Sequence, residues 1–270
     1  MRAARPETLL KIVNLLLPFT PVRARWLQLL VAVQVAAALA LWSSSGCRTL
    51  PTPMQIGGAW LDLVRHQDLL AELWTSVKVS LVALALSTLA AVATACLATA
   101  PLFMPLARLA AALRFLGFAG LTYVFMLLSG DAITLRVAIL GFGMFVFMVT
   151  ALLAQLKALP RSRIDHCRTL GMQHWRITWE LVVLGQADVI LDLVRQNAAI
   201  GWTLLTLVEG LTRSAGGIGA LLLNQNRYFL LAGVFAIQAT ILAVGLAQDA
   251  LLSLIKDIAC PWGTLDKETT

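Results

Sequence analysis

Charged residues are unusually scarce in this sequence. Asp, Glu, Lys and Arg make up 13% of the 270 residues, whereas hydrophobic residues make up 59% and the mean hydropathy is +0.83. A soluble domain carries about 25% charged residues. The shortage therefore excludes an ordinary soluble globular fold and predicts an all-α protein that crosses a membrane several times.

Metal-binding and nucleotide-binding patterns are also missing. The four cysteines lie at positions 47, 96, 167 and 260, and no two have the spacing of a metal site or a redox pair. The three histidines, His66, His166 and His174, are scattered, so we expect neither a disulfide framework nor a metal site. The glycine-rich stretch Thr212–Gly219 lacks the Lys-Ser/Thr of a phosphate-binding loop. If the protein uses ATP, another chain must hydrolyse it.

Long uncharged windows are present instead, and each is close to the roughly 17–25 residues that a spanning helix needs. They are Trp26–Trp42, Val79–Ala100, Val137–Leu156 and Tyr228–Gln248.

Two further spans bring the predicted number to about six. The third in chain order, Phe115–Gly130, is short because charged residues bound it. The fifth, Ala187–Glu209, is long enough but contains Asp188, Asp192 and Arg195.

The distribution of Lys and Arg predicts the orientation of these helices. With an even number of spans, both termini lie on one side, which holds fourteen of the 21 basic residues against six on the other. This bias places both termini, and the loop over residues 160–185, in the cytoplasm. The net charge of +7 is thus mostly a topology signal. Because the basic residues are divided among membrane flanks, nucleic-acid binding is not expected.

The chain accordingly divides into a cytoplasmic N-terminal segment (1–25), a transmembrane domain (26–256) and a cytoplasmic tail (257–270). The N-terminal segment lacks a signal-peptide cleavage pattern, and Leu9–Phe19 is expected to form a short helix on the inner membrane surface. In the first outer loop, the amphipathic run Met54–Trp74 is expected to form a helix at the outer interface.

A charged segment lies between two long apolar runs: the loop PRSRIDHCRTLGMQHWRITWELVVLG, residues 160–185. Ser162 and Asp165 have capping-box spacing, which predicts a short helix from Arg163 to Leu170. Gly171 fits a left-handed C-cap, and a second helix is expected to start near Met172.

The first helix of this loop has an apolar tip, Ile164, Cys167 and Leu170, which we expect to point outward. Charged side chains surround the tip, an arrangement typical of a docking surface. The second helix carries Trp175 and Trp179 one turn apart, which suits a position at the level of the lipid headgroups. The loop is therefore interpreted as an element that a soluble partner grips.

These residues resemble the cytoplasmic loop of binding-protein-dependent ABC importer permeases. The family's pattern is Glu-Ala-Ala, three residues, Gly, and a long gap to Ile-x-Leu-Pro. Asp165 stands at the Glu and Gly171 at the Gly, while His166 and Cys167 replace the two alanines, and Leu184 falls at the proline. The Arg-Thr-Leu-Gly core and Trp175 are similar to the nitrate/sulfonate/taurine subgroup.

Two later stretches extend the resemblance to roughly residues 50–257. VRQNAAIGWTLLTLVEGL resembles the subgroup's fifth span, with Arg195 near its start and Glu209 near its end. SAGGIGALL resembles the small-residue turn that follows. Prolines typical of the subgroup are missing from the third and fourth spans.

The resemblance implies a type I ABC importer permease in the bacterial inner membrane. Two permease subunits, most simply a homodimer, would form the pore. Two ATPase subunits would bind ATP and Mg²⁺ and dock on the loops, and an extracytoplasmic binding protein would deliver a small solute, an anion such as nitrate, a sulfonate or bicarbonate. This chain would carry no cofactor and no catalytic residue. The implied ATPase-docking residues are Asp165, His166, Cys167, Arg168, Leu170 and Gly171.

Polar residues share one face of the fifth span, since Asp188, Asp192, Arg195, Trp202, Thr206 and Glu209 are spaced 4, 3, 7, 4 and 3 apart. Charges at membrane depth should face protein or water. Arg195 either pairs with Asp192 inside the bundle or borders the translocation path and favours an anion. Glu209, at the outer end, is expected to make a helix-end or gate contact beside that path.

Two other classes of function stay open. An ATP-independent carrier or channel would leave the polar loop without a role, and such proteins usually show an inverted repeat, which is not found in the sequence. An intramembrane enzyme needs converging His, Glu or Asp side chains, whereas all three histidines lie in predicted water-facing loops. A co-purifying ATPase would discriminate between these classes and the importer.

Overall fold

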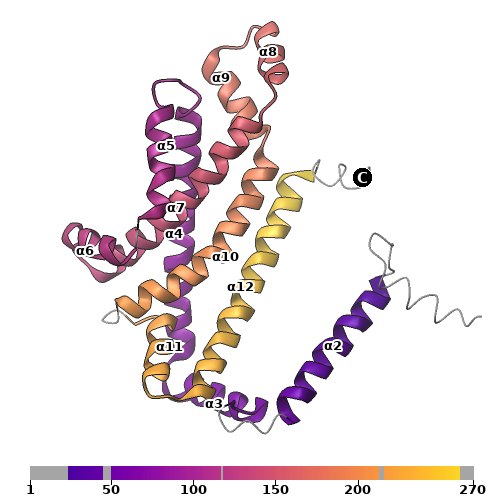
Figure 1. Ribbon diagram of the computed structural model, residues 1–270, viewed down its shortest axis with the longest axis vertical. Helices are drawn as coiled ribbons and strands as arrows, with labels where there is room; N and C mark the ends of the chain where they lie inside the picture. The colour runs from indigo at the N-terminus through magenta and orange to yellow at the C-terminus, as the bar shows by residue number, and fades with distance from the viewer. Residues whose placement is uncertain (1–23, 45–49, 117, 213–215, 262–270) are drawn as a thin grey trace, which may run out of the picture. The chain divides into compact units, whose positions relative to one another are not determined.

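The computed structural model describes residues 24–44, 50–116, 118–212 and 216–261. All regular elements in these residues are helices, as the composition predicts (Figure 1). Contacts divide the chain into two compact units, residues 1–55 and 56–270. The predicted surface helix Leu9–Phe19 and the end of the tail, 262–270, lie outside the described residues.

The first unit contains α2 (Ala24–Ser44) and the first residues of α3 (Pro53–His66). Helix α2 corresponds to the first predicted span, and nearly all of its described side chains are exposed. Its apolar stretch, Leu27–Trp42, is shorter than a full span.

In the second unit, three helices are long and apolar enough to cross a membrane: α4 (Leu69–Leu97), α7 (Ala132–Ala158) and α12 (Leu231–Ala259). They correspond to the second, fourth and sixth predicted spans. Each has 27 to 29 residues, which at about 1.5 Å per residue gives roughly 40 Å. That length exceeds the roughly 30 Å of a bilayer's hydrocarbon core.

The third predicted span is broken. Helix α5 (Met104–Ala112) and the 3₁₀ turn η1 (Leu113–Phe115) precede α6 (Phe118–Leu128), and the two parts are bent by 118°. The interruption follows from Leu116, whose backbone is extended. Helix α6 has 11 residues, about 16 Å of length, so it crosses a bilayer only as part of the bent pair.

The fifth predicted span forms α10 (Ala187–Leu211), a helix of 25 residues. Its polar residues make it less apolar than the three spans above. The described residues therefore show three candidate spans, or four if the bent pair is one crossing, where the sequence predicts six.

Small residues bring α4 and α7 together. The buried positions of α4 recur every three or four residues and include Ser80, Ala83, Ser87, Ala91 and Ala95. A Cβ added at Gly141 of α7 would lie 3.8 Å from the carbonyl oxygen of Ala83. Small side chains allow this close approach of two membrane helices, so packing accounts for Ser80 and Ser87 of α4.

The remaining helices lie at the two ends of this bundle. Helices α8 (Arg161–Thr169) and α9 (His174–Thr178) connect α7 to α10 through the π-helix η2 (Trp179–Leu184), and the C-terminal end of α12 points to the same end (Figure 1). Helix α11 (Ile218–Arg227) lies at the opposite end.

The predicted outer helix Met54–Trp74 is wrong as a single element. It divides between α3 and α4 at Gln67 and Asp68, and Asp68 adopts a left-handed conformation with φ 49°. A left-handed residue cannot continue a right-handed helix, so the chain turns there and Leu69–Trp74 begins α4.

Candidate functional site

The polar loop forms two short helices joined by a glycine turn. Gly171 has φ +73°, and the N–H groups of Gly171 and Met172 donate to the carbonyl oxygens of Arg168 (2.9 Å) and Cys167 (3.3 Å). These two bonds form a Schellman motif, in which the left-handed residue is usually glycine. The predicted left-handed C-cap at Gly171 is confirmed.

The start of α8 differs from the prediction. The helix begins at Arg161 with Pro160 as its N-cap residue, and the Pro160 side chain makes no capping bond. Ser162 therefore lies inside the first turn, and the predicted capping box with Asp165 is not the cap. Proline suits a helix start because its φ is fixed and it has no N–H to leave unpaired. Helix α9 also begins later than predicted, at His174.

Most of the predicted docking residues lie on the exposed surface of α8 and its turn. Asp165 and Arg168 form an exposed ion pair, with Arg168 Nη1 3.3 Å from Asp165 Oδ1. His166 is exposed, and Leu170 is 61% exposed.

The predicted outward direction of Cys167 is wrong, because only 8% of this residue is exposed. Ile164 is partly buried. The apolar tip on α8 is therefore Leu170 alone, and the docking role of the whole set stays a prediction.

The charged face of α10 packs against α12. Arg195 makes two hydrogen bonds to Asp249, including Nη2 to Oδ2 at 2.6 Å, and Asp192 pairs with Lys256. About two turns further along α10, Trp202 Nε1 donates to Gln248 Oε1 at 2.7 Å. We refer to these three contacts as the α10–α12 ladder.

The ladder replaces the pair predicted within α10. Asp192 and Arg195 each have a partner on α12, where helix packing places opposite charges at hydrogen-bonding distance. Sequence reasoning missed Asp249 and Lys256 because the sixth span was taken to end at Gln248. The signal was the spacing of Asp249 and Lys256, seven apart in an apolar run and so on one helix face.

A second polar cluster lies where α4, α10 and α11 meet. Glu209 is completely buried, and its carboxylate accepts from Ser76 Oγ (2.6 Å) and the Gly219 N–H (2.8 Å). Ser76 Oγ in turn accepts from the Ile218 N–H at 2.9 Å. Glu209 therefore contacts α4 two turns inside that helix and α11 in its first turn, and its place beside a translocation path stays a prediction.

Arg136 of α7 anchors the turn between α10 and α11. Its side chain is fully buried and donates to Thr212 Oγ1 (2.8 Å), the Thr212 carbonyl (2.6 Å) and the Gly216 carbonyl (2.8 Å). Glu72 of α4 accepts from the Gly217 N–H on the other side of the turn, where Gly217 has φ +94°. Sequence reasoning placed Arg136 only as a loop flank and missed this anchor, although an arginine beside an apolar run is a sign of a buried partner.

Groups of three or more His, Cys, Asp or Glu side chains that hold a metal ion are not found among the described residues. A scan of protein-family models finds none that matches this chain, and a search of curated proteins finds no significant match.

Proposed function

We propose that this chain is the membrane-spanning permease subunit of an ATP-driven importer of the ABC type. The ATPase would be a separate chain that docks on α8 and its glycine turn. The permease would move a small solute, and an anion is the solute class that the resemblance favours. The arrangement of α8, Gly171 and α9 carries this proposal.

This arrangement supports docking for three reasons. Helix α8 is short, polar and lies beyond the ends of the apolar helices α7 and α10 (Figure 1). Its turn is fixed by two backbone hydrogen bonds at Gly171, so the loop is an ordered element that can transmit force. The exposed Leu170 surrounded by charges offers an apolar contact with a polar rim.

The distribution of basic residues supports a cytoplasmic ATPase. The α8–α9 end of the second unit is also the end towards which α12 points. This end carries Lys157, Arg161, Arg163, Arg168, Arg176 and Lys256. Basic residues at one end of a membrane bundle favour the cytoplasmic side. In this proposal both termini are cytoplasmic, and two copies of the chain enclose one pore.

The α10–α12 ladder favours a structural role for Arg195. Its guanidinium already has a carboxylate partner in Asp249 with two hydrogen bonds. A two-bond Arg–carboxylate pair is among the stronger contacts in proteins, which leaves Arg195 little capacity for a solute anion. We therefore assign Arg195 first to the alignment of α10 with α12.

Two variants at Gly171 test the proposed function. A Cβ at this position would meet no atom within 4 Å, so a substitution there acts through the backbone alone. Valine strongly disfavours a left-handed conformation, whereas asparagine tolerates it. Full-length chain is purified in mild detergent from membranes of the organism that encodes it, and the ATPase activity that co-purifies is measured.

We expect the wild type and Gly171→Asn to retain an ATPase chain and its activity, and Gly171→Val to lose both while still inserting in the membrane. An ATPase retained equally by all three proteins would contradict docking through this turn. A wild type without any ATPase would contradict the importer itself.

A further inference from the structure

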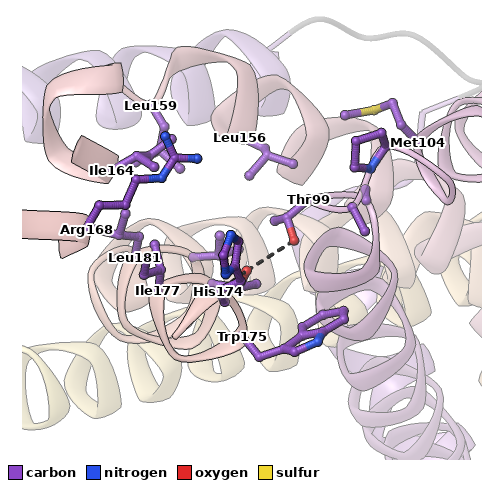
Figure 2. Close-up of a pocket in the computed structure, with 15 residues that line it drawn as sticks. Thr99, Met104, Leu156, Leu159, Ile164, Arg168, His174, Trp175, Ile177 and Leu181 are labelled. Atoms are coloured by element: carbon purple, nitrogen blue, oxygen red, sulfur yellow. Dashed lines mark hydrogen bonds between the residues drawn. The ribbon is translucent and has the colours of Figure 1, made fainter. Parts of the chain in front are cut away.

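A cavity of about 500 Å³ separates α8 and α9 from the ends of α4, α5 and α7 (Figure 2). Its volume lies within the roughly 300–1,000 Å³ typical of ligand sites. It is formed by three segments far apart in the sequence: the connection from α4 to α5, the end of α7, and the residues from α8 to η2. None of the contacts proposed above uses its interior.

The interior of the cavity is apolar. Met104, Leu156, Ile164 and Leu181 face it from four different elements (Figure 2). Its two hydroxyl groups are already hydrogen-bonded, because Thr99 Oγ1 and Thr178 Oγ1 lie 3.1 Å apart and Thr99 also donates to the Cys96 carbonyl at 2.7 Å. The interior thus offers little to a small polar solute and favours a hydrocarbon chain.

The rim of the cavity has the opposite chemistry. The exposed side chains of Arg168 and His174 line it, and the indole of Trp175 is 60% exposed beside them. Arg168 pairs with Asp165 at 3.3 Å, and both side chains are more than 60% exposed. Such an exposed pair contributes little, so Arg168 can turn to another anion.

The position of the cavity favours an occupant that comes from the membrane. Its apolar walls continue the last turns of α4 and α7, two of the candidate membrane spans. A tryptophan and basic residues at the end of such helices are typical of the boundary between hydrocarbon and headgroups. A lipid of the surrounding leaflet therefore reaches this site without leaving the membrane.

We propose that the cavity binds one anionic phospholipid. An acyl chain occupies the apolar interior, and the phosphate lies between Arg168 and His174. The lipid contacts α8 together with the ends of α4, α5 and α7, and so holds α8 against the bundle. This inference requires only that the chain lies in a membrane, and it is independent of the proposed ATPase.

Native mass spectrometry of the full-length chain in detergent tests the proposal, with added phosphatidylglycerol or phosphatidylcholine as probes. The variant Arg168→Gln with His174→Gln removes the headgroup contacts. Its matched control is Arg163→Gln with Arg176→Gln, which removes two exposed charges of the same loop that do not line the cavity. Ala100→Trp fills the interior, and Met104→Trp fills it from α5 in case the first variant does not fold.

We expect the wild type to retain one phosphatidylglycerol in preference to phosphatidylcholine. The headgroup variant should bind it at least about fivefold more weakly, because one basic residue near an anionic lipid contributes about that factor. The control should keep binding to within about twofold of the wild type, since its residues lie outside the cavity. Either cavity-filling variant should lose the bound lipid.

Equal retention of both lipids, a headgroup variant no weaker than its control, or a lipid still bound to a folded tryptophan variant would overturn the proposal. Retention of a free fatty acid in place of a phospholipid would also overturn it.

Discussion

Replacement of Arg136 tests how strongly the turn between α10 and α11 is anchored. The guanidinium is fully buried, and its hydrogen bonds to the described residues Thr212 and Gly216 are three, of 2.6 to 2.8 Å. Hydrogen bonds to charged groups contribute about 1.5–3 kcal/mol each, but contributions within one network are not additive. Removing one member of a buried charged network typically costs about 3–5 kcal/mol. We therefore expect Arg136→Met to lower the free energy of unfolding by about 3–5 kcal/mol.

Two further variants separate charge from geometry. Arg136→Lys keeps the charge but loses the planar fork, in which Nε donates to the Thr212 hydroxyl and Nη2 to the two carbonyl oxygens. We therefore expect it to lower the free energy of unfolding by about half as much as Arg136→Met. Thr212→Val removes one acceptor and should cost about 1–3 kcal/mol. In a double-mutant cycle, the combined variant Arg136→Met with Thr212→Val should lower the free energy of unfolding by less than the sum of the two single effects, because the two residues share a contact.

The assay is heat denaturation of the purified chain in detergent. About 1 kcal/mol corresponds to roughly 2–4 °C for a domain of this size, so Arg136→Met should lower the midpoint by about 6–12 °C, taking 3 kcal/mol as its effect. Gln155→Ala on the same helix serves as the control and should change the midpoint little. A midpoint of Arg136→Met within about 2 °C of the wild type, or strict additivity with Thr212→Val, would refute the anchoring role.

The other predictions concern the α10–α12 ladder, assembly and pH. Since Arg195 and Asp249 are partners, the double variant Arg195→Gln with Asp249→Asn should keep more uptake activity in vesicles than either single variant. Loss of uptake by an assembled double variant would contradict this structural role and support a place for Arg195 beside the translocation path. Native mass spectrometry should find two copies of the permease per two ATPase chains, and one permease per two ATPases would exclude a homodimeric pore. Hydrogen bonds from the side chain and then the backbone of Thr134 hold the pKa of Asp131 below its usual range. The stabilisation from this N-cap is therefore present at neutral pH and is lost as the pH falls through the lowered pKa. An NMR titration should show the Asp131 pKa rising in Thr134→Ala, and an unchanged value would contradict this cause.

The sequence predicted those elements that depend only on residues close together in the chain. Uncharged runs predicted the cores of α4, α7 and α12, because a span is determined by its own composition. Gly171 was predicted as a left-handed C-cap because it follows a short polar helix, and its φ of +73° confirms that prediction.

The sequence did not predict contacts that depend on neighbouring helices. The partner of Arg195 is 54 residues away on α12, and that of Asp192 is 64 residues away. The burial of Cys167 likewise depends on tertiary packing. A helical periodicity shows which residues share a face, as it did for α10, but not which helix that face meets.

Photocrosslinking at Leu170 tests the central proposal most directly. A photoreactive amino acid replaces Leu170, which is 61% exposed, in the full-length chain in its native membrane, and the same replacement at Leu127, which is 89% exposed on α6, serves as the control. The account predicts a crosslink from position 170 to an ATPase chain, identified by mass spectrometry, and none to that chain from position 127. A position 170 that crosslinks only to lipid or to other proteins in membranes where the chain transports solute would contradict it.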